Sequence, residues 1–182
     1  MMADNYTYVI DQGADWYQNF LYTQPATITN AVGNGVSITY TALNGFAAGQ
    51  TVYIDGILPS QYNLGNAIIA TRTATQFTVE NPASGLYLQG GNALSAVDLT
   101  GYEAKMQLRS HPSDADAVLT LTDTSGITID GPTGTLAVHA TAAQTRAIIE
   151  GPYYFDLEIT SPNDVVTRIV QGRIVVSAEV TR

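Results

Sequence analysis

The chain has 182 residues, and its seven Lys and Arg stand against sixteen Asp and Glu, giving a formal net charge of −9. This balance argues against nucleic-acid binding, which needs a basic face to displace counterions from the phosphates. Cysteine is absent, which excludes disulfides, thiolate metal sites and cysteine nucleophiles. Val, Ile, Thr, Tyr, Phe and Trp together account for 67 residues, whereas Glu and Lys account for only six. The composition therefore predicts an all-β chain.

Neither a membrane helix nor a signal peptide is predicted. The sequence has no apolar run near the ~20 residues that a membrane helix requires. Its first six residues lack the basic flank and the apolar stretch of a secretory signal. We therefore expect a chain that is made without export and does not bind membranes.

The first 22 residues predict two strands, at 6–10 and 15–22, separated by a turn around Gly13. In the second strand Trp16, Phe20 and Tyr22 fall on one face at a period of two, with Gln18 as the exception. Such a pattern is typical of a strand that is buried on one side.

Residues 25–92 have a different composition, since they are rich in glycine and contain only three formal charges. Short alternating segments bounded by Gly, Asn or Pro recur here at 26–29, 36–41, 51–54, 67–71 and 76–79. Several short strands at this spacing predict a small β-barrel or sandwich.

The composition and the strand pattern change again from Val97 onward. Six strands are predicted in this part, at 103–109, 118–122, 127–130, 135–139, 151–160 and 165–177. Alternation places Met106 on the buried face of one strand and Phe155 with Leu157 on that of another, and we also expect Tyr102 in the core. Only 141–150 looks helical, with Thr141 as its N-cap and Gly151 as its stop.

This order of segments predicts one domain that is interrupted by another. Residues 1–22 are too few to fold alone, and their partners lie after residue 93, in a stretch of the same texture. We therefore expect a discontinuous sandwich of 1–22 and 93–182, with a small β-barrel inserted at 23–92. Both ends of the insert, 23–25 and 89–92, have the composition of linkers.

Four stretches of the predicted sandwich carry a resemblance to a known family: IDQGAD at 10–15, VDLTGYEAKMQLR at 97–109, GPYYFDLEI at 151–159, and VTRIVQGRIVVSAEVTR at 166–182. Together they resemble small structural proteins of tailed bacteriophages and prophages, and are similar to the N-terminal domain of phage baseplate upper proteins. The resemblance implies an immunoglobulin-like sandwich. The usual family member has a short turn before its DLTGY motif, where this chain has about seventy residues.

The insert carries a second resemblance, through residues 44–57, 62–64 and 76–79. This series looks like a small β-barrel module of phage tail proteins, one likened to a half-domain of ubiquitin-activating enzymes. The likeness implies a fold only, because the chain has no cysteine that could carry such chemistry.

Candidates for chemistry are sparse. His111 and His139 lack partners at the spacing of a metal site or a catalytic triad, so structural roles are expected. Carboxylates at 114, 116, 123 and 130 (Asp114, Asp116, Asp123 and Asp130) could offer oxygens to Ca²⁺, but lack the spacing of a calcium loop and suit turns. The glycines form no phosphate loop. We therefore predict no catalytic residue, no metal and no cofactor.

Five residues are candidates for an interface. Tyr17 and Tyr154 lie opposite the expected core faces of their strands, where exposed aromatics favour protein contacts or bind a sugar. Tyr62 lies at the tip of the loop 59–63, which could dock on a partner. Val175 and Val176 lie in the last strand, which could pair with a neighbouring subunit if it is an edge strand.

These observations lead to three functional hypotheses. The first is a non-enzymatic structural protein of a tailed-phage virion, associated with the tail or baseplate, whose sandwich anchors and whose insert projects. The second is a capsid decoration protein, and the third is a glycan-binding or glycan-cleaving receptor module. The resemblance implies other virion proteins as partners and a homo-oligomer, for which a trimer would be suitable, assembled in the host cytoplasm.

Overall fold

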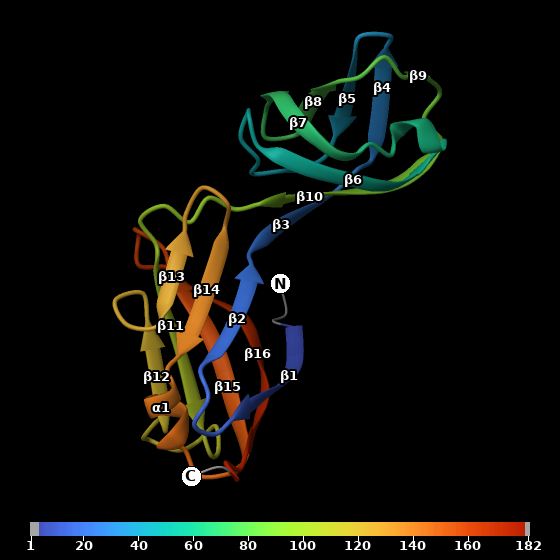
Figure 1. Cartoon of the computed structure of the whole chain (residues 1–182). Helices are drawn as coiled ribbons and strands as arrows, with labels where there is room; N and C mark the ends of the chain where they lie inside the picture. The colour runs from blue at the N-terminus through green and yellow to red at the C-terminus, as the bar shows by residue number, and fades with distance from the viewer. Residues whose placement is uncertain (1–3, 181–182) are drawn as a thin grey trace. The chain divides into compact units, whose positions relative to one another are not determined.

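In the computed structural model, which describes residues 4–180, the protein is built almost entirely of β-strands (Figure 1). This confirms the all-β prediction. The chain divides into two compact units. The first contains the residues up to Tyr22 and those from Asp98 onward, and is called the sandwich unit here. The second, Thr23–Val97, is called the insert; it ends at 97, whereas the sequence predicted 92.

Two sheets face each other in the sandwich unit. The five-stranded sheet has the order β1 (Asp4–Asp11), β16 (Val166–Ser177), β15 (Gly151–Thr160), β11 (Glu103–Arg109) and β12 (Leu119–Thr122). The three-stranded sheet has the order β13 (Ile127–Asp130), β14 (Thr135–Ala140) and β2 (Trp16–Leu21). Neighbouring strands are antiparallel, except that β1 runs parallel to β16.

Alternation along the strands builds the core between these two sheets. Met106, Phe155 and Leu157 are buried as predicted, whereas Tyr102 is half-buried. An aromatic cluster closes one side of the core, where the Tyr8 ring lies 5.7 to 6.1 Å from the rings of three other residues, Trp16, Phe20 and Phe155. Edge-to-face contacts of this kind add to the stabilisation from burial.

The last strand is an inner strand, contrary to the edge position that the sequence suggested. β16 pairs with β15 on one side and with β1 on the other. Its ladder groups are therefore already paired within the chain, and β1 and β12 are the edges of this sheet. Strand addition from another subunit would have to use one of those two edges.

The single α-helix of the described residues is shorter than predicted. α1 spans Ala142–Arg146, whereas the prediction was 141–150. Thr141 is the N-cap, as expected, and forms a capping box with Gln144. No helix in residues 4–180 is both long and apolar enough to cross a membrane.

One curled sheet of eight strands forms the insert, with the order β3-β10-β6-β7-β8-β5-β4-β9. It does not close into the predicted barrel, because β3 and β9 are its two edges. The bounds are β3 (Thr23–Thr27), β4 (Asn30–Asn34), β5 (Ser37–Thr41), β6 (Thr51–Leu58), β7 (Gly65–Arg72), β8 (Gln76–Glu80), β9 (Ser84–Gly85) and β10 (Gln89–Ala96), with a 3-10 turn at Ser60–Tyr62.

The insert has its own hydrophobic core on the concave side of its sheet. The Phe77 ring stacks on Tyr40 at 5.1 Å and contacts Phe46 edge-on at 5.4 Å. All three side chains are buried. A core that is made only of the insert's own residues is what an independently folding unit requires.

Both stretches with the composition of linkers are strands. β3 and β10 pair with each other, from Thr23 opposite Ala96 to Thr27 opposite Asn92. Pro25 is tolerated because β3 is an edge strand, where a missing N–H breaks no ladder. Gly91 has a φ of 116°, and a Cβ there would collide with Ile57, so glycine is required within the strand.

The chain leaves and re-enters the sandwich unit at a single turn. The Tyr22 N–H donates to the Gly134 carbonyl at 2.9 Å, and the Leu99 N–H donates to the Gly131 carbonyl at 2.8 Å. Both residues thus bond to the turn between β13 and β14. This arrangement is what an insertion at a hairpin position needs, because the two ends of the host chain stay close together.

Candidate functional site

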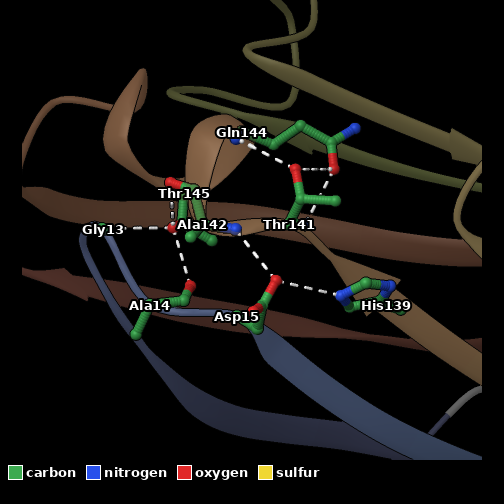
Figure 2. A network of polar contacts seen from close by, with 8 residues as sticks. All are labelled: Gly13, Ala14, Asp15, His139, Thr141, Ala142, Gln144 and Thr145. Carbon is green, nitrogen blue, oxygen red and sulfur yellow. Dashed lines mark hydrogen bonds and ion pairs between the residues drawn. The ribbon is translucent and has the colours of Figure 1, made fainter.

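A network of polar contacts ties the turn between β1 and β2 to α1 (Figure 2). The Thr145 hydroxyl donates to the Ala14 carbonyl at 2.8 Å and accepts from the Gly13 N–H at 3.1 Å. Thr145 is fully buried, so these bonds satisfy a group that could not reach water. The turn and the helix are therefore held together by a hydroxyl group that both donates and accepts a hydrogen bond.

Asp15 joins the same network to β14. Its Oδ1 accepts from the Ala142 N–H at 3.0 Å and lies 3.1 Å from Nε2 of His139 (Figure 2). The hydrogen bond with His139, followed by the one from Ala142, lowers the pKa of the Asp15 carboxyl. The Tyr17 ring stacks on the His139 ring at 4.3 Å. The structure thus brings together Tyr17 and His139, which the sequence analysis treated separately.

This network suits a structural role. A carboxylate beside an imidazole is two thirds of a catalytic triad, but a triad also needs a nucleophile within hydrogen-bond reach of the imidazole. Among the described residues, His139 contacts Asp15 and Tyr17, and the Thr145 hydroxyl is used by backbone groups. We conclude that the network positions the first turn against α1.

A groove of about 680 Å³ lies on the outer face of the five-stranded sheet, opposite the core. We call it the outer groove; its lining comes from β1, β11, β15 and β16, with Pro112 from the loop after β11. Strand register places Arg109, Tyr154 and Arg173 in one cross-strand row, because Tyr154 pairs with both arginines. Neighbouring strands are about 4.8 Å apart, so the two arginines bracket the tyrosine.

These two arginines donate hydrogen bonds to neutral groups rather than to carboxylates. Arg173 Nη2 donates to the Tyr154 hydroxyl at 3.3 Å, and its guanidinium lies 5.2 Å from the centre of that ring. Arg109 donates to the Gln107 side chain at 2.9 Å and to the Asp114 backbone carbonyl. Within residues 4–180 neither guanidinium has a carboxylate at ion-pair distance. This part of the groove is called the cationic end.

The other end of the outer groove holds one positive and two negative side chains. Arg168 lies 3.1 Å from Asp156 and 3.2 Å from Glu158, and its Nη1 donates to Gln171 at 3.3 Å. Burial raises the pKa of the Asp156 carboxyl, and the nearby Arg168 opposes that shift. This part is called the acceptor end, because its carboxylates and amide oxygens can accept hydrogen bonds.

An apolar row crosses the outer face of the insert. Leu94 pairs with Pro25 on one side and with Tyr53 on the other, and Ile68 lies diagonally next along the same face. Leu94, Tyr53 and Ile68 are 40, 48 and 58% exposed, and Pro25 is exposed as well. These four residues, called the apolar row, span the neighbouring strands β3, β10, β6 and β7.

The five predicted interface residues lie in different environments in the structure. Tyr17 is 67% exposed, Tyr154 is half-buried in the outer groove, and Val175 faces outward on β16. Tyr62 is fully buried: its hydroxyl donates to the Gly85 carbonyl and its own carbonyl accepts from Tyr40, so its assignment to an exposed loop tip was wrong. Val176 is buried in the core, so only Val175 of that pair can face a neighbour.

Two of the four acidic candidates, Asp114 and Asp123, accept hydrogen bonds from backbone N–H groups. The Asp114 side chain accepts from the His111 N–H at 2.8 Å, and Asp123 accepts from the Ala104 N–H at 3.3 Å. No group of three or more potential metal ligands occurs among the described residues. The His111 ring packs edge-on against Tyr154 at the margin of the outer groove.

The sequence analysis missed the outer groove and the apolar row. Part of the signal for the groove was present, because Arg109 and Tyr154 occupy outward positions of strands whose alternation was recognised, whereas the faces of the strand that carries Arg173 had not been assigned. Register between strands was needed to bring the three together. The apolar row required the pairing of β3 with β10, in stretches that had been assigned to linkers.

Comparison with known proteins supplies no identification. No family model matches the chain, and no curated protein matches it at the threshold of significance.

Proposed function

We propose that the protein is a non-enzymatic structural component of a tailed-phage virion, associated with the tail or baseplate. In this proposal the sandwich unit anchors the chain and the insert makes a second contact. The observation that carries it is the apolar row, which places exposed Tyr53 and Leu94 side by side on a unit with hardly any charge. The resemblance of the sandwich segments to phage structural proteins supports the virion as its setting.

The physical reason is that exposed apolar surface of this kind marks contact sites. Scattered apolar residues are normal on a protein surface, but a continuous row on neighbouring strands is characteristic of an interface. Aromatic residues and a shortage of charged ones are also the compositional signal of interface cores. The insert meets both criteria, since Asp55, Arg72 and Glu80 are its only formal charges.

Mass spectrometry of particles purified from a phage that encodes this chain tests the setting. Tail or baseplate association predicts a few to a few dozen copies per particle, measured against the major capsid protein. Hundreds of copies would favour the alternative role as a capsid decoration protein. Absence of the chain from purified particles would contradict the virion proposal in either form.

A pair of variants tests the contact. Ile68→Lys puts a charge into the apolar row and should prevent incorporation into particles while the isolated protein stays folded, because Ile68 is exposed. Leu43→Lys is the matched control, since Leu43 is an exposed apolar residue of the same unit outside the row. Normal incorporation of Ile68→Lys would show that the apolar row is not the contact.

A further inference from the structure

We propose that the outer groove of the sandwich unit binds a carboxylate-bearing saccharide. Its volume, about 680 Å³, falls within the range of about 300–1,000 Å³ that is usual for small-molecule sites. The groove gathers three of the seven basic residues of an acidic chain, namely Arg109, Arg168 and Arg173. This inference goes beyond the proposed function, and it requires neither a virion nor a second subunit.

The cationic end supplies the site for the carboxylate. Arg109 and Arg173 flank Tyr154 in one cross-strand row, and within residues 4–180 neither forms an ion pair, although the charge of Asp156 interacts with that of Arg109 at longer range. Guanidinium groups bind carboxylates through two parallel hydrogen bonds, which gives both strength and orientation. The Tyr154 hydroxyl, which already accepts from Arg173, adds a neutral polar group between the two charges.

The acceptor end supplies partners for sugar hydroxyls. Asp156, Glu158 and Gln171 are half-buried and face the same groove. Their planar groups are held in place by Arg168, which bonds to all three. Fixed acceptors of this kind are suited to hydroxyl donors, because they need no reorganisation when a ligand binds.

The order of charges along the groove selects a saccharide over other anions. A peptide of Asp and Glu residues and a DNA strand have no hydroxyl donors beside their negative charges. Either would turn carboxylates or phosphates toward Asp156 and Glu158 while it reached the cationic end, and like charges at close range cost binding energy. A sugar chain places hydroxyls beside its carboxylates, so both ends of the groove find complementary groups.

Isothermal titration of the full chain with trigalacturonic acid, in low-salt buffer at pH 7, tests the proposal. The expected result is saturable binding that weakens as the salt concentration rises. Arg173→Gln and Arg109→Gln should each weaken binding by about tenfold or more. Arg72→Gln is the matched control, because it removes one positive charge from an exposed position of β7 in the insert, away from the groove lining. It should change the affinity less than about twofold.

Two comparison ligands sharpen the test. Maltotriose lacks the carboxylates and should bind at least about tenfold more weakly than trigalacturonic acid. Triglutamate has carboxylates but no hydroxyls and should also bind more weakly, and Asp156→Asn should reduce that difference by removing the like charge. Each variant is included only if its circular dichroism spectrum is identical to that of the wild type.

Several outcomes would overturn the proposal. Absence of saturable binding to trigalacturonic acid would do so, as would an equal loss of affinity in Arg72→Gln and Arg173→Gln. Tighter binding of triglutamate than of the saccharide would identify a peptide site instead. Because the assay uses the isolated chain, its result is independent of whether the protein is found in phage particles.

Discussion

The sandwich unit and the insert differ in how they enclose a core and in what they present outward. The sandwich unit packs two sheets around an aromatic cluster centred on Tyr8, and its outer face is lined by ionic side chains such as Arg168 and Glu158. The insert curls one sheet around Tyr40, Phe46 and Phe77, and its outer face carries the apolar row. One chain thus presents a polar outer face on one unit and an apolar row on the outer face of the other.

The two units therefore have separate cores and different outer surfaces. The insert has three formal charges, Asp55, Arg72 and Glu80, whereas the four ion pairs identified among residues 4–180 lie in the sandwich unit. Substitutions that should affect one unit and not the other test whether the two units are independent. The chain offers a probe for this, because its single tryptophan, Trp16, lies in the sandwich unit.

The largest effect is expected at two neighbouring residues of β16. Val176→Lys buries a charge without a partner in the sandwich core and should cost more than about 4 kcal/mol of unfolding free energy, or prevent folding. Val175→Lys places the same side chain on the outer face and should change stability by less than about 1 kcal/mol. Urea unfolding followed by Trp16 fluorescence measures both. Similar costs for the two variants would show that the strand faces are assigned incorrectly.

A smaller but more informative pair compares the two cores. Leu157→Ala should lower the unfolding free energy of the sandwich unit by about 2–5 kcal/mol, through lost burial and a cavity. Phe77→Ala should destabilise the insert by about 3–5 kcal/mol. Only the first variant should move the urea transition seen by Trp16 fluorescence, while methyl NMR signals of the insert report the second. A shift of the Trp16 transition in Phe77→Ala would contradict independent cores.

The smallest effect concerns Asp15 and pH. Its hydrogen bonds with His139 and Ala142 lower its pKa below the ordinary value of 3.8. The carboxylate form is therefore favoured by folding, and its stabilisation is present above pH 3.8 and lost as the pH falls through the lower folded pKa. Asp15→Asn should flatten this acid limb of a plot of sandwich stability against pH. An unchanged acid limb in Asp15→Asn would show that the contacts of Figure 2 do not stabilise the fold.

Much of the sandwich unit could be predicted from the sequence because its strands alternate clearly. Glu103–Arg109, Ile127–Asp130 and Gly151–Thr160 have the predicted bounds. The helix was predicted too long, because Thr141 marks a helix start clearly but Ile148 packs into the core after the helix has ended. Strand register, which places Arg109 and Arg173 beside Tyr154, is a property of pairs of segments and is not visible in either one alone.

The insert was harder to predict. Asn30–Asn34 and Gln89–Ala96 are strands whose glycine and asparagine content is typical of loops, and each is specified by its partner strands. Tyr62 was assigned to an exposed tip because Pro59 and Asn63 surround it, yet its ring fills the insert core. In both cases long-range packing overrides local composition.

Excision of the insert tests the central claim, that the chain is two independently folded units, most directly. A chain in which Tyr22 is joined to Asp98 by a short Asn-Gly turn lacks Thr23–Val97 but keeps both bonds to the turn between β13 and β14. Urea unfolding followed by Trp16 fluorescence should remain a single cooperative transition, with a free energy within about 1 kcal/mol of the value for the full chain. Loss of that cooperative transition would show that the sandwich unit depends on the insert, and would contradict the account.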